Sequence, residues 1–234
     1  MAVIRCLTLC TVLLASAISW AEQPKKKDSE PWYYKLARIL GVDRAPVSLK
    51  GPAGAKPGEL WISAADHVDQ RLLAAGTDFK SPVFQPRGKY VFALRGDELV
   101  RVSSAGGTAV KVRSLPGVVK LVGFDGSNPD RVLALFETGG SGDAHKLDVV
   151  LVSVTTAKSQ TIAKGRAADS EQMESLLGWQ RQYGSIYVRP QGGDIIVGGI
   201  QPVDVPVSDC RDAECGQPAY SPELGQVAFI RSGR

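Results

Sequence analysis

Histidine is scarce in this 234-residue chain, in which only His67 and His145 occur. Both stand in hydrophilic turns, where a solvated imidazole is the usual state. The sequence also lacks the P-loop pattern of phosphate-binding proteins and the Gly-x-Ser-x-Gly elbow of hydrolases with a serine nucleophile. A histidine-based site would need partners from distant parts of the chain. We therefore predict no catalytic residue, no metal ligand and no cofactor.

The turn around His67 offers the one local cluster that could bind a cation. Asp66, His67 and Asp69 are neighbours in sequence, but their spacing is not that of a known calcium loop. A hydrolytic or lyase site with a metal ion would require these three side chains, or other acids, to converge in space around a ligand.

Neither sign of charge dominates. Lysine and arginine total 28 and aspartate and glutamate total 24, for a formal net charge of +4. So small an excess, spread along the sequence, gives no case for nucleic acid as a partner. Beyond residue 21 no apolar run has the length of a transmembrane helix, so we expect no membrane span in the mature chain. The sequence identifies no small-molecule ligand.

The first 21 residues form a segment of their own. Arg5 precedes an apolar run, and the segment closes on Ser19-Trp20-Ala21, with small residues where a signal peptidase needs them. We predict that residues 1–21 are a cleaved signal peptide and that the mature protein is periplasmic. A retained N-terminal anchor is the alternative.

Cysteine is also rare, with four residues in the chain. Cys6 and Cys10 leave with the predicted signal peptide, and Cys210 and Cys215 remain. In an oxidising compartment such a pair is expected to form a structural disulfide. The alternative is a redox-active or metal-binding pair, but the spacing is not the two-residue spacing of redox motifs.

Residues 22–58 are predicted to be a leader with a short helix and a linker rich in proline and glycine. Pro31 suits a first helical turn and Gly41 suits a helix end. The helix has an apolar stripe opposite Lys35 and Arg38. It either covers one end of the domain or docks on a partner, and its candidate partner-binding residues are Trp32, Tyr33, Leu36, Ile39 and Leu40.

Residues 59–234 have a β pattern in which one sequence motif recurs: an apolar strand, a turn with proline or glycine, and a second apolar strand. Copies begin near residues 81, 121, 185 and 217. The match between the first and last copies pairs Phe84 with Tyr220, Pro86 with Pro222, Gly88 with Gly225 and Phe92 with Phe229. Repeats of four strands without helices are typical of β-propellers.

The two ends of this region complement each other. The last copy contains only its first two strands, whereas strands at 59–63 and 70–74 precede the first full copy. We predict that residues 227–230 pair with residues 60–62, which would complete one blade and remove exposed sheet edges. The expected fold is an all-β, small propeller of four to five four-stranded blades, preceded by the short helix.

The segments Ser81–Gly107 and Gln217–Ile230 resemble the blade repeat of TolB-type propellers, in which a Ser-Pro, an aromatic residue, a Pro-containing turn and an apolar strand recur. The turns here, such as Gln85-Pro86-Arg87-Gly88, lack the aspartate usual in that repeat, so the resemblance is to the repeat family and not to TolB itself. It implies an extracytoplasmic, non-catalytic scaffold that binds another protein of the cell envelope. The alternative is a propeller-type hydrolase or lyase, or the non-catalytic propeller part of one, with a polar or metal-binding central channel at whose mouth Asp66, His67 and Asp69 would converge, and it rests on fold-level analogy.

Overall fold

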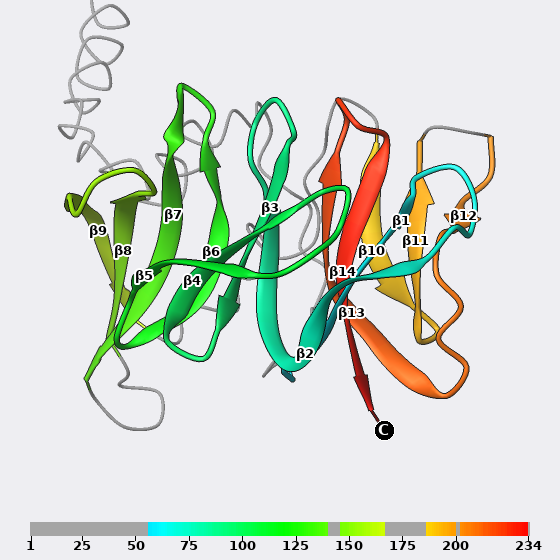
Figure 1. The fold of residues 1–234 in the computed structure, drawn as a ribbon, viewed down its shortest axis with the longest axis horizontal. Coiled ribbons are helices and arrows are strands. Elements are labelled where there is room, and N and C mark those ends of the chain that lie inside the picture. The colour runs from blue at the N-terminus through cyan, green and yellow to red at the C-terminus, as the bar shows by residue number, and fades with distance from the viewer. Residues whose placement is uncertain (1–55, 140–145, 167–185, 200–201, 234) are drawn as a thin grey trace, which may run out of the picture. The chain divides into compact units, whose positions relative to one another are not determined.

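The computed structural model describes residues 56–139, 146–166, 186–199 and 202–233, which belong to one compact unit. These residues form antiparallel β-strands and contain no helix. The all-β part of the expected fold is confirmed, whereas the predicted signal peptide and the helix at 31–41 lie outside the described residues. The strands are β1 Gly58–Ala64, β2 Arg71–Phe84, β3 Tyr90–Arg95, β4 Glu98–Ser103, β5 Val110–Ser114, β6 Val118–Asp125, β7 Asn128–Gly139, β8 Lys146–Ser153, β9 Ser159–Arg166, β10 Tyr187–Gln191, β11 Asp194–Gly198, β12 Val205–Pro206, β13 Ala213–Ser221 and β14 Gln226–Gly233 (Figure 1).

The long strand β2 belongs to two groups of strands. Its first residues pair with β1 and its last residues pair with β3. Gly76 lies at a register shift in the pairing of β2 with β1 and adopts a φ of +132°, which glycine tolerates and other residues rarely adopt. The strands form three sheets: a seven-stranded sheet in the order β13-β14-β1-β2-β3-β4-β5, the four-stranded sheet β6-β7-β8-β9 and the three-stranded sheet β10-β11-β12. We refer to the two parts of the seven-stranded sheet that share β2 as sheet A (β13-β14-β1-β2) and sheet B (β2-β3-β4-β5), to the four-stranded sheet as sheet C and to the three-stranded sheet as sheet D.

Sheet A joins the two ends of the described chain. Strand β14 pairs antiparallel with β1, with Leu60 opposite Ile230 and Ile62 opposite Ala228. The predicted pairing of residues 227–230 with residues 60–62 is therefore confirmed. Within the ranges that the structure describes, none of the sheets closes into a barrel or ring of hydrogen-bonded strands.

The core lies between neighbouring sheets. Because side chains alternate along a strand, β3 sends Val91 and Ala93 into a cluster shared with sheet A, and Phe92 and Leu94 into a cluster shared with sheet C. A third cluster lies between sheets A and D and includes Phe229. Three packed interfaces thus hold the sheets in the order D, A, B, C.

The copies that begin at 81 and 217 also share a backbone detail. Ser81 and Gln217 each precede a proline, each has a φ of +51°, and each lies at a register shift of its strand. The Gln217 side chain accepts a hydrogen bond from the Ser81 amide at 2.7 Å and donates to the Lys56 carbonyl at 2.9 Å. Two equivalent bulges of adjacent sheets are therefore linked by one amide side chain.

The copy predicted at 185–197 is a hairpin of the opposite orientation, which corrects its alignment with the other copies. The turn between β10 and β11 contains Gly193, whose carbonyl accepts a hydrogen bond from Cys215 near the start of β13. In the copy at 217 the turn follows the end of β13 instead. A Gly-Gly turn fits a hairpin of either orientation, so the turn sequence alone did not show the direction of β10.

Candidate interaction surface

The turns of several sheets meet at one end of the strands. Leu224, between β13 and β14, lies so close to Gly88 that a Cβ atom there would be 2.9 Å from the Leu224 Cγ. Gln85, before β3, donates to the carbonyl of Pro129 at 3.3 Å. Ala65, after β1, donates to the carbonyl of Gly225 at 2.8 Å. We call this surface, made of residues 65–70, 85–89, 125–130 and 222–225, the turn face.

Local sequence explains why the central turn forms. The Gly88 amide donates to the Gln85 carbonyl at 3.0 Å, which closes a four-residue turn with Pro86 at its second position. Arg87 at the third position has a φ of +64°, as a turn of type II requires. Proline fixes the first dihedral, and the turn predicted from Pro86 and Gly88 is present.

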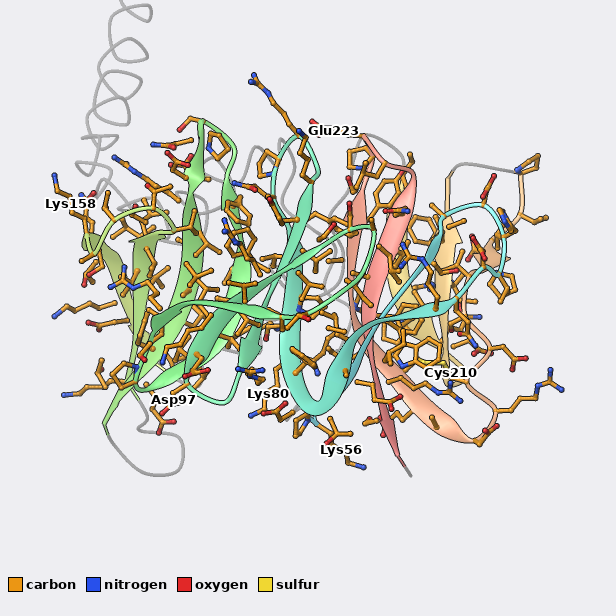
Figure 2. The ribbon with its side chains drawn as sticks, viewed as in Figure 1. Lys56, Lys80, Asp97, Lys158, Cys210 and Glu223 are labelled. Atoms are coloured by element: carbon orange, nitrogen blue, oxygen red, sulfur yellow. A yellow bond between two sulfur atoms is a disulfide. The ribbon has the colours of Figure 1, made fainter. Side chains whose placement is uncertain are left out.

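Charged and apolar side chains are mixed on the turn face. Arg87, Lys89 and Glu223 are exposed, and so are Leu224 (40%) and Val68 (46%). Figure 2 shows Glu223 at one end of the strands, and Lys56, Lys80 and Asp97 toward the other end. The turn face combines apolar contact area with charges of both signs, a composition that suits a protein surface better than a polyanion.

The cluster around His67 lies in the turn after β1. His67 Nδ1 is 2.6 Å from Asp66 Oδ1, and both side chains are more than half exposed. Asp69 is held through its amide, which donates to Ser63 Oγ at 3.0 Å. No three His, Cys, Asp or Glu residues in the described part of the chain form a group that could hold a metal ion, and His145 lies outside it.

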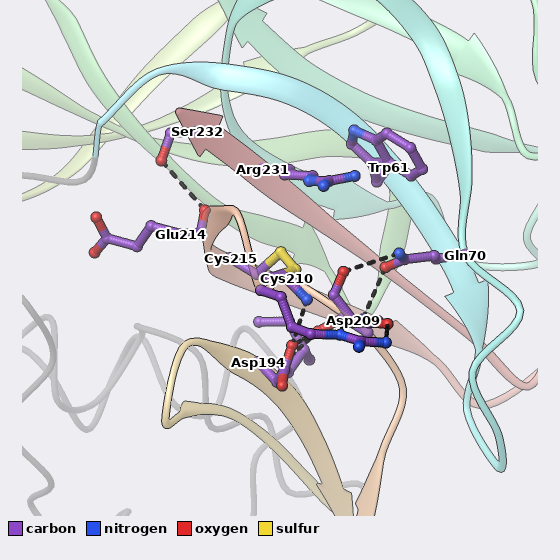
Figure 3. The surroundings of a disulfide bond; sticks show 12 residues. Trp61, Gln70, Asp194, Asp209, Cys210, Glu214, Cys215, Arg231 and Ser232 are labelled. Atoms are coloured by element: carbon purple, nitrogen blue, oxygen red, sulfur yellow. Dashed lines mark hydrogen bonds and ion pairs between the residues drawn. A yellow bond between two sulfur atoms is a disulfide. The ribbon is translucent and has the colours of Figure 1, made fainter. Parts of the chain in front are cut away.

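Cys210 and Cys215 form a disulfide, as the sequence predicted, with their Cα atoms 6.1 Å apart. Both are 2% exposed and belong to the cluster between sheets A and D. The pair therefore lies in the core, at the segment that leads from sheet D into β13 (Figure 3).

Two polar side chains hold the disulfide loop from opposite sheets. The side-chain amide of Gln70, which precedes β2, donates a hydrogen bond to the backbone carbonyl of Asp209 and accepts one from the backbone N–H of Asp209, both at 3.0 Å. Asp194 at the start of β11 accepts from the Cys210 amide at 2.7 Å and from Ser208 Oγ at 3.2 Å. The loop thus ties sheet D to sheet A, and Figure 3 shows Gln70 and Asp194 on different sides of it.

Sequence reasoning missed a polar cluster on sheet D. The Tyr187 hydroxyl donates to Asp204, and the Arg189 guanidinium donates to the other carboxylate oxygen at 3.0 Å. The Tyr187 ring covers Gly198, where a Cβ atom would overlap it. Arg189 and Tyr187 are 15 and 17 positions from Asp204 in the sequence, so no local sequence signal could have revealed the cluster.

The cluster perturbs both acids. The hydrogen bond from Tyr187, together with the Arg189 guanidinium, lowers the pKa of the Asp204 carboxyl below its ordinary value. The same hydrogen bond to Asp204 raises the pKa of Tyr187. Because a lowered carboxyl pKa favours the folded state only while the group is ionised, its contribution is present above the unfolded-state pKa and disappears in acid.

Replacing Asp204 with asparagine therefore gives a pH-dependent loss of stability. We expect Asp204→Asn to unfold at a lower urea concentration than the wild type at pH 7. The gap should narrow as the pH falls below about 4 and through the lowered pKa of Asp204. Urea titrations between pH 2.5 and 7 measure it, with Asp130→Asn, an exposed aspartate of the turn face, as control. A gap that is constant with pH would contradict the role of the ionised carboxylate.

The chain matches no known protein-family model and no curated protein sequence. No helix among the described residues is long and apolar enough to cross a membrane. The candidate partner-binding residues at 32–40 lie outside the described residues, so the turn face is the candidate site that the described structure offers.

Proposed function

We propose that this protein is a small β-propeller of the periplasm that binds another envelope protein and acts as a non-catalytic scaffold. The pairing of β14 with β1 supports the propeller, because it completes a four-stranded blade from distant parts of the chain. The resemblance of residues 81–107 and 217–230 to TolB-type blades supports it independently. The buried Cys210–Cys215 disulfide supports an oxidising compartment.

We place the partner on the turn face. The observation that carries this choice is the direct contact between turns of three sheets, through Leu224 with Gly88 and Gln85 with Pro129. Loops positioned by a rigid scaffold are the usual binding elements of β folds. Since the core clusters fix the strands beneath these turns, the turn face is preorganised and binding costs little ordering entropy.

A charge-swapped turn face tests the proposal. The double variant Arg87→Glu with Glu223→Arg keeps the net charge, and both side chains are exposed. We expect it to lower affinity for the envelope partner about tenfold, or about 1.4 kcal/mol. Affinity capture from envelope extracts, followed by titration with the captured partner, measures this change.

The matched control swaps charges at the other end of the strands, with Lys80→Glu and Asp97→Lys. That variant should bind like the wild type. Equal losses of affinity in both variants would mean that the partner responds to the charge distribution of the whole protein and not to the turn face. Unchanged affinity in both variants would contradict the assignment of the partner to the turn face. Deletion of residues 31–40 completes the set, because loss of every partner in that variant alone would assign the contact to the predicted helix.

A further inference from the structure

Sheet B has an excess of positive charge. From Phe79 to Ser114 it contains seven lysines and arginines but two acidic residues, Asp97 and Glu98. Both acids lie where β3 leads into β4, at the end of the strands opposite the turn face, and Figure 2 shows Asp97 toward that end. Glu98 forms ion pairs there with Arg95 and Lys111. The end of sheet B that belongs to the turn face therefore has no acidic residue.

Three basic side chains surround the central turn at this end. Arg87 and Lys89 flank Gly88 and are exposed. Arg101 of β4 is exposed too, and its guanidinium lies over the ring of Tyr90, 5.1 Å from the ring centroid. Within the ranges that the structure describes, none of the three basic side chains pairs with a carboxylate. We call Arg87, Lys89 and Arg101 the basic turn.

The adjoining turns of sheet A have the opposite charge. Residues 64–70 and 221–226 contain Asp66, Asp69 and Glu223 but no lysine or arginine. They lie beside the basic turn, because Leu224 packs against Gly88 and the two turns of sheet A are joined by the hydrogen bond from Ala65 to Gly225. The turn face is thus divided into an acidic part on sheet A and a basic part on sheet B. A uniformly anionic polymer that covered both parts would be repelled by sheet A.

We propose that the partner of the turn face presents an acidic protein segment to the basic turn. This inference rests on the proposed function and specifies the chemistry of the partner. A guanidinium can bind a carboxylate through two parallel hydrogen bonds, and the stacking of Arg101 on Tyr90 holds that guanidinium in place before binding. Arginine and tyrosine are also the residue types that often dominate the binding energy of interfaces. The acids of sheet A repel the same segment, so they fix the orientation of the partner.

An acidic peptide tests the charge preference of the basic turn. The probe is a fluorescent peptide of about ten residues in which glutamate alternates with alanine, and in its counterpart lysine replaces each glutamate. The protein should bind the glutamate peptide and not the lysine peptide. Its affinity should fall several-fold between about 50 and about 200 mM sodium chloride, because salt screens exposed charges. Binding of neither peptide, or of the lysine peptide alone, would overturn the proposal.

Matched variants locate the binding of this peptide. Lys89→Gln with Arg101→Gln should lower the affinity for the glutamate peptide about tenfold. The control, Lys146→Gln with Lys164→Gln, removes the same charge from two exposed positions of sheet C and should bind like the wild type. Equal losses in both variants would overturn the proposal. So would stronger binding of heparin than of the peptide at the same concentration of negative charge, because the basic turn would then fit a polyanion better than a protein segment.

Zero-length cross-linking in envelope extracts separates this inference from the proposed function. A carbodiimide joins a lysine amine to a carboxylate that it contacts, so Lys89 should become linked to an aspartate or glutamate of the bound protein. The variant Arg87→Lys with Arg101→Lys keeps the charge and should add such links at both positions. Links from Asp66, Asp69 or Glu223 to lysines of the bound protein, with none from the basic turn, would overturn this inference and leave the proposed function intact. Links confined to Lys56 and Lys80, at the other end of the strands, would contradict both.

Discussion

Replacing Phe229 with alanine should lower the free energy of unfolding by about 3–5 kcal/mol. Phe229 is fully buried, belongs to the cluster between sheets A and D, and stands opposite Trp61 in the pairing of β14 with β1. Truncation removes most of its buried area and leaves a cavity that strands pinned on both sides cannot refill. Urea denaturation of the purified protein measures the loss, which is large against a typical total of about 5–15 kcal/mol.

Leu72→Ala is the matched control for this prediction. Leu72 lies opposite Trp61 on the other neighbouring strand, but it is 44% exposed, so its truncation should cost less than about 1 kcal/mol. Similar losses in the two variants would show that β14 is not a core strand of sheet A. A third variant, Phe229→Leu, should recover most of the stability because it refills the cavity.

Removing the disulfide with Cys210→Ser and Cys215→Ser should cost about 2 kcal/mol, the loop-closure entropy of so short a loop. The cysteines are five positions apart, which limits the constraint on the unfolded chain. The buried position adds a further loss, since two hydroxyl groups would replace sulfur in an apolar cluster. Thermal and urea unfolding of the double variant measure the sum.

Reduction of the wild type provides the control for this prediction. In denaturant with dithiothreitol the wild type should lose stability, whereas the double variant should not change. Because both cysteines are 2% exposed, the folded wild type should resist the reductant until it unfolds. Rapid reduction of the folded protein would contradict the buried position of the disulfide.

Strand identity followed from local sequence. Apolar runs within residues 90–95 and 98–103, separated by a glycine-containing turn, correspond to β3 and β4. The pairing of β14 with β1 was predictable too, because an incomplete copy at one end and unattached strands at the other require each other. The disulfide followed from the absence of any other cysteine outside the first ten residues.

Direction and side-chain convergence did not follow from local sequence. The hairpin at 185–197 has a turn that fits either orientation, and only the contact of Gly193 with Cys215 fixes which end of the strands it occupies. The Tyr187, Arg189 and Asp204 cluster depends on β12 lying beside β11, a pairing of two residues on a strand too short to leave a periodic signal.

The recurring strand–turn–strand motif therefore specifies the strands, the turns and the pairing of β14 with β1. These features depend on dihedral preferences and on which face of a strand is apolar. Which turns touch, and which carboxylate meets which arginine, are decided by the stacking of sheets. Stacking depends on side chains that are distant in sequence. It forms the turn face through two contacts, that of Leu224 with Gly88 and the hydrogen bond from Gln85 to the Pro129 carbonyl.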